Sequence, residues 1–220
     1  MPKYMIHAYQ PRMWYVEEFL IPSMVAQGIP REDITVWNDT ERKGNLAACM
    51  EAFASCTAEG GTWHLQDDVV ISANFAEKTR EYDHGVVYGF CNRYFHDDPG
   101  IHGEVYAEDM WHSFQCVRIP NNYARECVEW VRSGEAAKWG EPAILLKLNK
   151  GDDTIFRHFL IDRHGRETVT NLAPNIVNHI DYMIGGSAIN QWRGHLAMSD
   201  LWEDSSIISK LKQQLEERGR

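Results

Sequence analysis

The 220-residue sequence contains no apolar run as long as the roughly eighteen residues that a helix needs to cross a bilayer. Its first residues lack the long apolar core of a signal peptide, so the sequence predicts a cytoplasmic protein. Its five cysteines form no C-x-x-C pair, which favours buried thiols in a reducing compartment over a disulfide framework or a zinc site. These shortages argue against a membrane-spanning helix and against a small secreted scaffold.

Basic residues are also scarce, because 22 Lys and Arg stand against 32 Asp and Glu, for a net charge of −10. This balance argues against a broad phosphate-binding face, although it leaves room for a local basic groove. Hydrophobic residues make up 44% and aromatic residues 11%, which is typical of a folded globular protein. There is no internal repeat, low-complexity tract or obvious linker, so we expect one substantial domain.

The first half of the sequence alternates predicted strands and helices. The strands are residues 4–9, 34–37, 62–65 and 85–91, and the helices are 14–26, 46–53 and 75–82. This alternation predicts an α/β fold with a mostly parallel sheet and helices on both faces. In such sheets ligands bind beyond the carboxyl ends of the strands.

The second half is less regular. It contains a predicted helix at 121–131, an apolar strand or helix at 143–148 and an apolar-periodic stretch at 155–161. Near the end, Ile207, Ile208, Leu211 and Leu215 repeat at helical spacing. This stripe predicts a helix that docks on its own domain, with a contact to a partner or second copy as the alternative.

Polar residues follow three of the predicted strands, in the pairs His7 and Tyr9, Asn38 and Asp39, and Asp67 and Asp68. Adjacent carboxylates repel, so fixing both at one strand end favours a bound cation or good hydrogen-bond donors. Oxygen ligands suit Mg²⁺ or Mn²⁺. The alternative is a turn in which these residues cap the next helix.

The segment Leu65-Gln66-Asp67-Asp68-Val69, with Phe75 beyond it, resembles the metal motif of GT-A-fold glycosyltransferases, which use nucleotide-sugar donors. That motif, known as DxD, also occurs as E-D-D, and the departure here is Gln66 in place of the first acid. The resemblance implies a GT-A (Rossmann-like) fold, with Asp68 as the Mn²⁺ or Mg²⁺ ligand. Asp67 would contact the ribose or a metal-bound water, and Gln66 would lie on the nucleotide-sugar side.

Residues 36–46 are similar to the second strand of that family and the loop after it. In that pattern Asn38 and Asp39 meet the base or ribose, while Arg42, Lys43 and Asn45 lie near the nucleotide. His7 and Tyr9 fit the place where uracil stacks, which implies a UDP-sugar donor. The alternatives are a solvated turn with an Asn helix cap for the loop, and ordinary packing for Tyr9.

Gly151-Asp152-Asp153 resembles the x-E-D motif of the same family, whose second acid acts as general base in inverting members. The resemblance assigns this role to Asp153, with Asp152 as the substitute. The chemistry requires a carboxylate there, because an acceptor hydroxyl must lose its proton as it attacks the sugar. The alternative is a helix N-cap, and inversion follows only if Asp153 is the base.

Residues 174–181 resemble a P-x-x-V-x-H segment in which a histidine completes the metal shell. His179 would then bind Mn²⁺ beside Asp68, whereas a lone histidine is more often structural. Gly185-Gly186-Ser187 follows, as a flexible lid or a phosphate contact.

Together these features predict a metal-dependent glycosyltransferase that moves a sugar from a nucleotide donor to a hydroxyl of a saccharide, a small molecule or a modified nucleic-acid base. We expect a nucleotide-binding half at about 1–92, an acceptor half at about 93–200 and a C-terminal helix at about 203–218. Residues 94–111, which include Glu104, Glu108 and Asp109, would lie over the acceptor. The alternatives are a metal-dependent hydrolase that uses the scattered histidines, and a nucleotide-sugar-binding module without catalytic activity.

Overall fold

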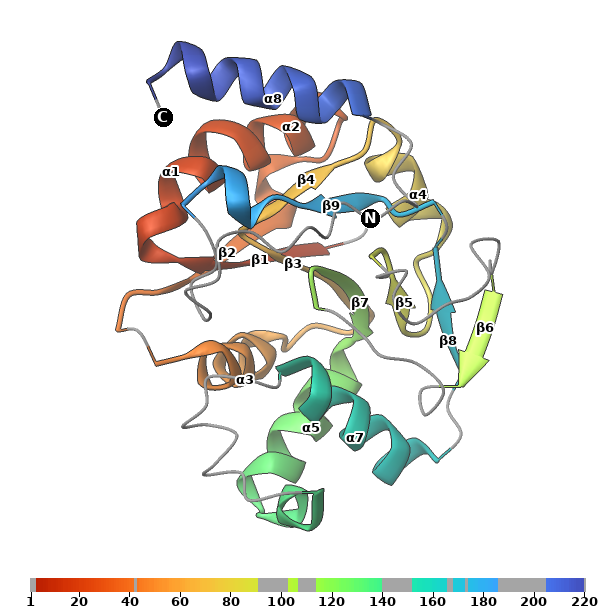
Figure 1. Cartoon of the computed structure of the whole chain (residues 1–220). Coiled ribbons are helices and arrows are strands. Elements are labelled where there is room, and N and C mark those ends of the chain that lie inside the picture. The colour runs from red at the N-terminus through yellow and green to blue at the C-terminus, as the bar shows by residue number, and fades with distance from the viewer. Residues whose placement is uncertain are drawn as a thin grey trace.

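A computed structural model describes residues 3–41, 43–90, 103–106, 114–139, 152–165, 168–172, 174–185 and 205–219. At its centre is a seven-stranded sheet with the order β2-β1-β3-β7-β5-β8-β6 (Figure 1). The strands are β1 (Lys3–Tyr9), β2 (Ile34–Asp39), β3 (Gly61–Gln66), β5 (Val87–Tyr88), β6 (Gly103–Tyr106), β7 (Cys116–Pro120) and β8 (Thr168–Asn171). A separate two-stranded sheet joins β4 (Val69–Ile71) and β9 (Val177–His179).

The central sheet contains both parallel and antiparallel strand pairs. β1 pairs in parallel with β2 and β3, and β5 pairs in parallel with β8. β7 runs antiparallel to both β3 and β5, and β6 runs antiparallel to β8. The parallel strands β1, β2 and β3 carry the predicted site residues His7, Tyr9, Asn38, Asp39 and Gln66. By contrast, β6 and β7 come from segments where the sequence predicts no strand.

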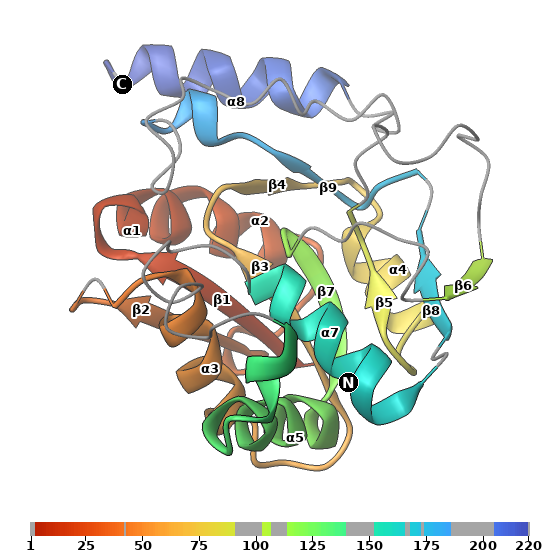
Figure 2. The same ribbon diagram turned by 60° about the horizontal axis from the view of Figure 1, so that its bottom comes forward.

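Helices cover both faces of the sheet, as the sequence predicts (Figures 1 and 2). One hydrophobic core lies under α1 (Met13–Tyr15), the π-helical turn Val16–Leu20, α2 (Ile21–Ala26), α4 (Phe75–Glu81) and α8 (Ser205–Glu217). The other core lies under α3 (Asn45–Ser55), α5 (Asn121–Arg132) and α7 (Asp152–His164). The predicted helix 14–26 is present as α1, the π-helical turn and α2 in succession.

The apolar sequence of β1 follows from this two-sided packing. Tyr4 and Ile6 enter the first core, while Met5 between them enters the second. A strand that is buried on both faces needs apolar residues at successive positions rather than at alternate ones. Helix α7 packs on the second core with Ile155, Phe156, Phe159 and Leu160.

The C-terminal helix α8 docks on the chain itself, which confirms the favoured interpretation of its apolar stripe. Ile208, Leu211 and Leu215 are buried in the first core. The guanidinium of Arg218 pairs with Glu18 and lies over the ring of Phe19. Across the described ranges, no helix is both long enough and apolar enough to cross a membrane.

Several sequence predictions fall outside the described residues. These are the apolar segment 143–148, Gly186 and Ser187, and residues 94–111 apart from β6. Strands of the two proposed halves pair in one sheet, since β3 and β5 both join β7. The division into a nucleotide-binding half and an acceptor half stays a prediction.

Candidate active site

The parallel strands β1, β2 and β3 end at one edge of the sheet, and their last residues are Tyr9, Asp39 and Gln66. Two helices begin at this edge, α3 at Asn45 and α7 at Asp152. Asn45 Nδ2 donates a hydrogen bond of 2.8 Å to Asp152 Oδ1, which joins the two N-termini. Strand ends and helix N-termini thus meet where ligands bind in open α/β sheets.

The carboxylates of Asp67 and Asp68 follow β3 and are both buried. Arg12, in the 3-10 turn Gln10–Arg12 after β1, places Nη1 2.8 Å from Asp67 Oδ1 and 2.6 Å from Asp68 Oδ2. The backbone N–H of Tyr9 donates to Asp67 Oδ2 at 2.5 Å. Arg12 is only 6% exposed, so both ion pairs are shielded from water.

A distant segment brings His179 to the same carboxylate. β4 and β9 pair antiparallel with Val69 opposite His179, and the N–H of Ile180 donates to the carbonyl oxygen of Asp68 at 2.8 Å. His179 Nε2 lies 3.3 Å from Asp68 Oδ2 and 3.9 Å from Asp181 Oδ2. The structure therefore brings together the two residues that the resemblance implied as metal ligands, and it adds Asp181 beside them.

The charges of this cluster shift one another's pKa values. Burial and the neighbouring Asp68 raise the pKa of Asp67 to about 6, although Arg12 opposes the shift. Burial alone would raise the pKa of Asp68, but His179 and Arg12 hold it well below its usual value. Burial would lower the pKa of His179, yet the Asp68 carboxylate raises it. Asp68 is thus the more readily ionised member of the acid pair.

Buried oxygens without partners test whether a divalent cation fits this cluster. Among the described residues, Asp68 Oδ1 and both carboxylate oxygens of Asp181 are buried and have no hydrogen-bond partner. Carboxylate oxygens with one imidazole suit Mn²⁺. No group of three or more His, Cys, Asp or Glu side chains in the described ranges is already arranged to hold a metal, and Arg12 supplies part of the positive charge. The donor atoms beside the Asp68–His179 pair nevertheless fit a divalent cation.

Asp152 and Asp153 open α7 and differ in their surroundings. Asp152 accepts hydrogen bonds from Asn45 and from the N–H of Asp153, at 2.8 and 3.0 Å. Burial and the Asp153 charge raise the pKa of Asp152 to about 7, although a hydrogen bond from the Gln66 side chain lowers it in part. Asp153 Oδ1 accepts the N–H and the hydroxyl of Thr154, at 2.6 and 3.2 Å.

Burial also raises the pKa of Asp153, which is less enclosed than Asp152. Both of its hydrogen bonds go to Oδ1, so in the described ranges no residue donates to Oδ2. Asp153 therefore holds the start of the helix with one oxygen and can accept a proton on the other. The helix-cap and general-base interpretations are compatible at this residue.

The residues on the predicted nucleotide side have different partners. His7 Nε2 lies 2.8 Å from His64 Nδ1, and burial lowers the pKa of His7 to about 4, so His7 is neutral at pH 7. Asn38 donates its side-chain amide to Gln10. His7 pairs with Gln66 in the register of β1 and β3. The Gln66 side chain in turn hydrogen-bonds to Asp152.

The loop after β2 is held by Asp39, whose carboxylate accepts the N–H groups of Lys43 and Gly44 at 3.0 and 3.3 Å. Gly44 has a φ of 93°, a conformation that favours glycine. The ammonium group of Lys43 pairs with Glu51 and Glu41 at 2.8 and 3.3 Å. Lys43 is thus engaged with acids in this structure, and Arg42 lies outside the described residues.

Arg12 and Asp181 are the two members of the cluster that sequence analysis missed. Arg12 follows Pro11 directly after a strand, which is typical of an ordinary surface turn. Asp181 stands two residues after His179, so the H-x-D spacing was the available signal. That spacing gains meaning only once β9 is known to lie against β4.

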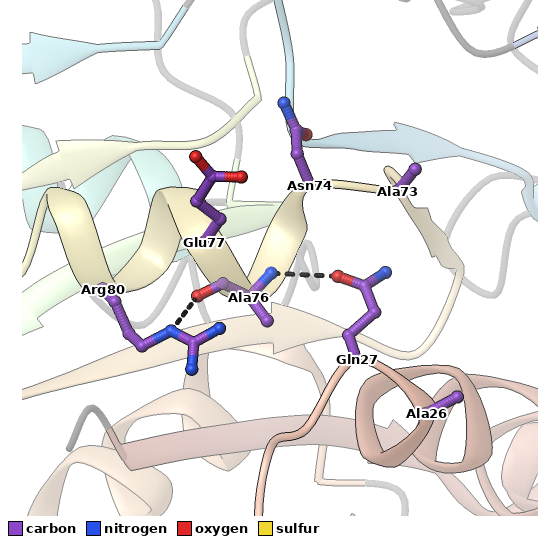
Figure 3. A pocket seen from close by; sticks show the side chains of 7 residues that line it. All are labelled: Ala26, Gln27, Ala73, Asn74, Ala76, Glu77 and Arg80. Carbon is purple, nitrogen blue, oxygen red and sulfur yellow. Dashed lines mark hydrogen bonds between the residues drawn. The ribbon is translucent and has the colours of Figure 1, made fainter.

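A hollow of about 510 Å³ lies elsewhere, between α2 and α4 (Figure 3), and its lining residues are Ala26, Gln27, Ala73, Asn74, Ala76, Glu77 and Arg80. Gln27 bridges its walls, since it donates to the Ser72 carbonyl at 2.7 Å and accepts the Ala76 N–H at 3.0 Å. None of the predicted site residues lines this hollow.

Comparisons with known proteins find little. No family model matches the sequence, and no curated protein matches it significantly. Among solved structures, the galactosyltransferase LgtC, crystallised with donor and acceptor sugar analogues, matches with a TM-score of 0.43 and 12% identity. The match covers 96% of this chain and 95% of that chain. This similarity in fold is too low to carry an argument about substrates or mechanism.

Proposed function

We propose that the protein is a metal-dependent glycosyltransferase that uses a nucleoside diphosphate sugar. The observation that carries the proposal is the meeting of Asp68 and His179, 3.3 Å apart, at the sheet edge where α7 begins with Asp152 and Asp153. Glycosyl transfer from such a donor needs a cation for the diphosphate and a base for the acceptor hydroxyl. This edge offers a group for each.

The donor would lie over the ends of β1, β2 and β3. A uracil base would meet Tyr9 and neutral His7. The Asn38 amide could donate or accept hydrogen bonds with the base and ribose, and the Asp39 carboxylate could accept them. The loop at Gly44 would let the backbone approach the nucleotide closely, because glycine carries no side chain. We assign a UDP-sugar as donor on this basis.

Asp68 and His179 would hold Mn²⁺ or Mg²⁺. When bound, the ion would neutralise the charge that develops on the departing nucleoside diphosphate. Arg12 keeps Asp67 and Asp68 in place, with Nη1 within 2.8 Å of both carboxylates. Asp67 would reach the ribose or a metal-bound water by exchanging one of the hydrogen bonds that it now accepts from Arg12 and from the Tyr9 N–H.

Asp153 would act as the general base. Its Oδ2 takes the proton of the acceptor hydroxyl while the hydroxyl oxygen bonds to the anomeric carbon and the bond from that carbon to the diphosphate oxygen breaks. The electron pair of that bond leaves with the nucleoside diphosphate, and the configuration inverts. Asp152, tied to Asn45 and Gln66, orients the start of α7 relative to the donor loop. The acceptor is a saccharide, a small molecule or a hydroxylated nucleic-acid base.

Two variants test this division of roles. Asp153→Asn should keep the affinity for UDP and Mn²⁺ and lower the transfer rate by about 10²- to 10⁴-fold, because only the proton acceptor is lost. Asp68→Asn should lose Mn²⁺-dependent UDP binding. Donor binding can be measured by calorimetry, and turnover by release of UDP in the presence of a panel of acceptors.

Full turnover in Asp153→Asn would contradict the base assignment. Metal-dependent UDP binding by the parent without turnover on any acceptor would favour a binding module instead. Hydrolysis of phosphoesters that requires metal, without UDP binding, would favour the hydrolase.

A further inference from the structure

Asp181 has a buried carboxylate that takes no part in the proposed mechanism. It begins the 3-10 turn Asp181–Met183 directly after β9 and is 1% exposed. A buried carboxylate usually has hydrogen-bond partners for its oxygens. Here only the carbonyl oxygen of Asp181 accepts a hydrogen bond in that turn, from Ile184. Neither side-chain oxygen has a hydrogen-bond partner among the described residues.

Among the described residues, His179 is the basic side chain that lies within 4.0 Å of the Asp181 carboxylate. The distance of 3.9 Å from Asp181 Oδ2 to His179 Nε2 is too long for a hydrogen bond, and the same nitrogen is 3.3 Å from Asp68 Oδ2. The two carboxylates thus converge on one imidazole nitrogen. Asp68 has a second buried oxygen, Oδ1, that also lacks a hydrogen-bond partner within the described part of the chain.

The local charge balance calls for a cation. Asp67, Asp68 and Asp181 are three carboxylates, and Arg12 is the fixed cation that pairs with the first two. One negative charge remains uncompensated if His179 is protonated, and two remain if it is neutral. Buried carboxylates without hydrogen bonds or paired charges are costly, so positions like these are usually paired or bind metal. A divalent ion would supply the missing charge.

We propose that Asp181 is a third protein ligand of the divalent cation, together with Asp68 and His179. This inference rests on the proposed function for the metal site and deepens it. Two carboxylates and one imidazole favour Mn²⁺ over Mg²⁺, because Mg²⁺ prefers oxygen ligands and keeps more of its water. The remaining coordination positions of the cation would be left for water and for the donor diphosphate.

The test is direct measurement of Mn²⁺ binding by calorimetry and by the loss of the free-ion spin-resonance signal, without nucleotide. Asp181→Asn should weaken Mn²⁺ binding by about tenfold or more, as should Asp68→Asn. Asp33→Asn is the matched control, because Asp33 is also a buried carboxylate but pairs with Lys3 before β2. That control should bind Mn²⁺ as the parent does.

Thermal unfolding in chelator separates a ligand from a structural residue. If Asp181 is a ligand, Asp181→Asn should leave the metal-free Tm equal or higher, since it removes a buried charge without a hydrogen bond, and should lose most of the Tm increase on adding Mn²⁺. A lower metal-free Tm with parental Mn²⁺ affinity would overturn the inference while leaving Asp68 and His179 in place. Absence of Mn²⁺ binding by the parent would instead overturn the metal site itself.

Discussion

Arg12 has an unusual position, because one guanidinium nitrogen lies within hydrogen-bond distance of two buried carboxylates. In the absence of metal it supplies the positive charge that lets Asp67 and Asp68 lie side by side. Removing one partner of a buried ion pair leaves the other charge without compensation, which is usually worse than removing both. Arg12 therefore stabilises the acid pair directly and prepares it for a cation.

Arg12→Met should lower the free energy of unfolding in chelator by about 3–5 kcal/mol. Added Mn²⁺ should restore part of this loss, because the ion takes over the compensation of the Asp68 charge. Urea unfolding with chelator and with Mn²⁺ measures both effects.

Arg118→Met is the matched control, since Arg118 is also buried and pairs with Asp83 at 2.7 Å, away from the candidate site. It should destabilise the protein, with no gain from Mn²⁺ beyond that of the parent. Equal rescue of both variants by Mn²⁺ would show that Arg12 has no special relation to the metal.

At the level of secondary-structure elements, the loop between β2 and α3 connects the proposed nucleotide-binding strand end to the start of α7, where the proposed general base Asp153 lies. Asp39 holds its backbone, Gly44 turns it at φ 93°, and Asn45 at its end binds Asp152. A side chain at position 44 would be strained in this conformation whatever space surrounds it.

Gly44→Ala should therefore cost about 1–3 kcal/mol of stability and also weaken UDP binding, because the loop must shift to relieve the strain. Gly28→Ala is the matched control: Gly28 has a φ of 82°, and its N–H bonds to Val25 after α2. The control should lose stability without losing UDP affinity. Equal UDP affinity in both variants would remove the loop from the donor site.

The elements that the sequence predicts well are those whose pattern is local. The apolar segments that become β1, β2 and β3 end at polar residues, so the edge with Asp39, Gln66 and Asp67 could be expected from the sequence. The strand β7 could not, because its five residues include Arg118 and it is stabilised by pairing with β3 and β5 from elsewhere in the chain.

The same limit applies to the candidate site. Asp68 and His179 were identified by resemblance, while their approach to 3.3 Å depends on the pairing of β4 with β9. Arg12 carries no sequence motif of its own, and the H-x-D spacing of Asp181 gains meaning only from the fold. Their placement follows from long-range packing, which sequence periodicity does not report.

At the scale of the whole molecule, Asp152 couples stability to pH. Burial raises the pKa of Asp152 from 3.8 to about 7, so the folded protein binds this proton more tightly than the unfolded chain does. Stability contributed by the protonated form is therefore full below about pH 4 and is lost as the pH rises towards 7.

The parent should lose about 1–3 kcal/mol of its free energy of unfolding between pH 5 and pH 8 because Asp152 loses its proton. Asp152→Asn should not show this loss. Urea unfolding of both proteins at the two pH values gives the difference. An unchanged pH dependence would mean that Asp152 is ionised normally in the folded state.

The two faces of the sheet support different parts of the candidate site. The core under α1, α2, α4 and α8 also contains β4 and β9, which carry the proposed metal ligands to the edge. The core under α3, α5 and α7 supports the donor loop and the proposed base. The sheet edge between these layers is where a nucleotide sugar and its acceptor would meet.

Binding of UDP to the parent protein, measured with Mn²⁺ and again with chelator, tests the metal-dependent donor site most directly. A ligand that binds only the folded state raises thermal stability with its concentration, so a thermal-shift titration with calorimetry is sufficient. We predict a shift with UDP that requires Mn²⁺ and disappears in Asp68→Asn. A shift with Mn²⁺ alone and none with any nucleoside diphosphate would contradict the glycosyltransferase proposal.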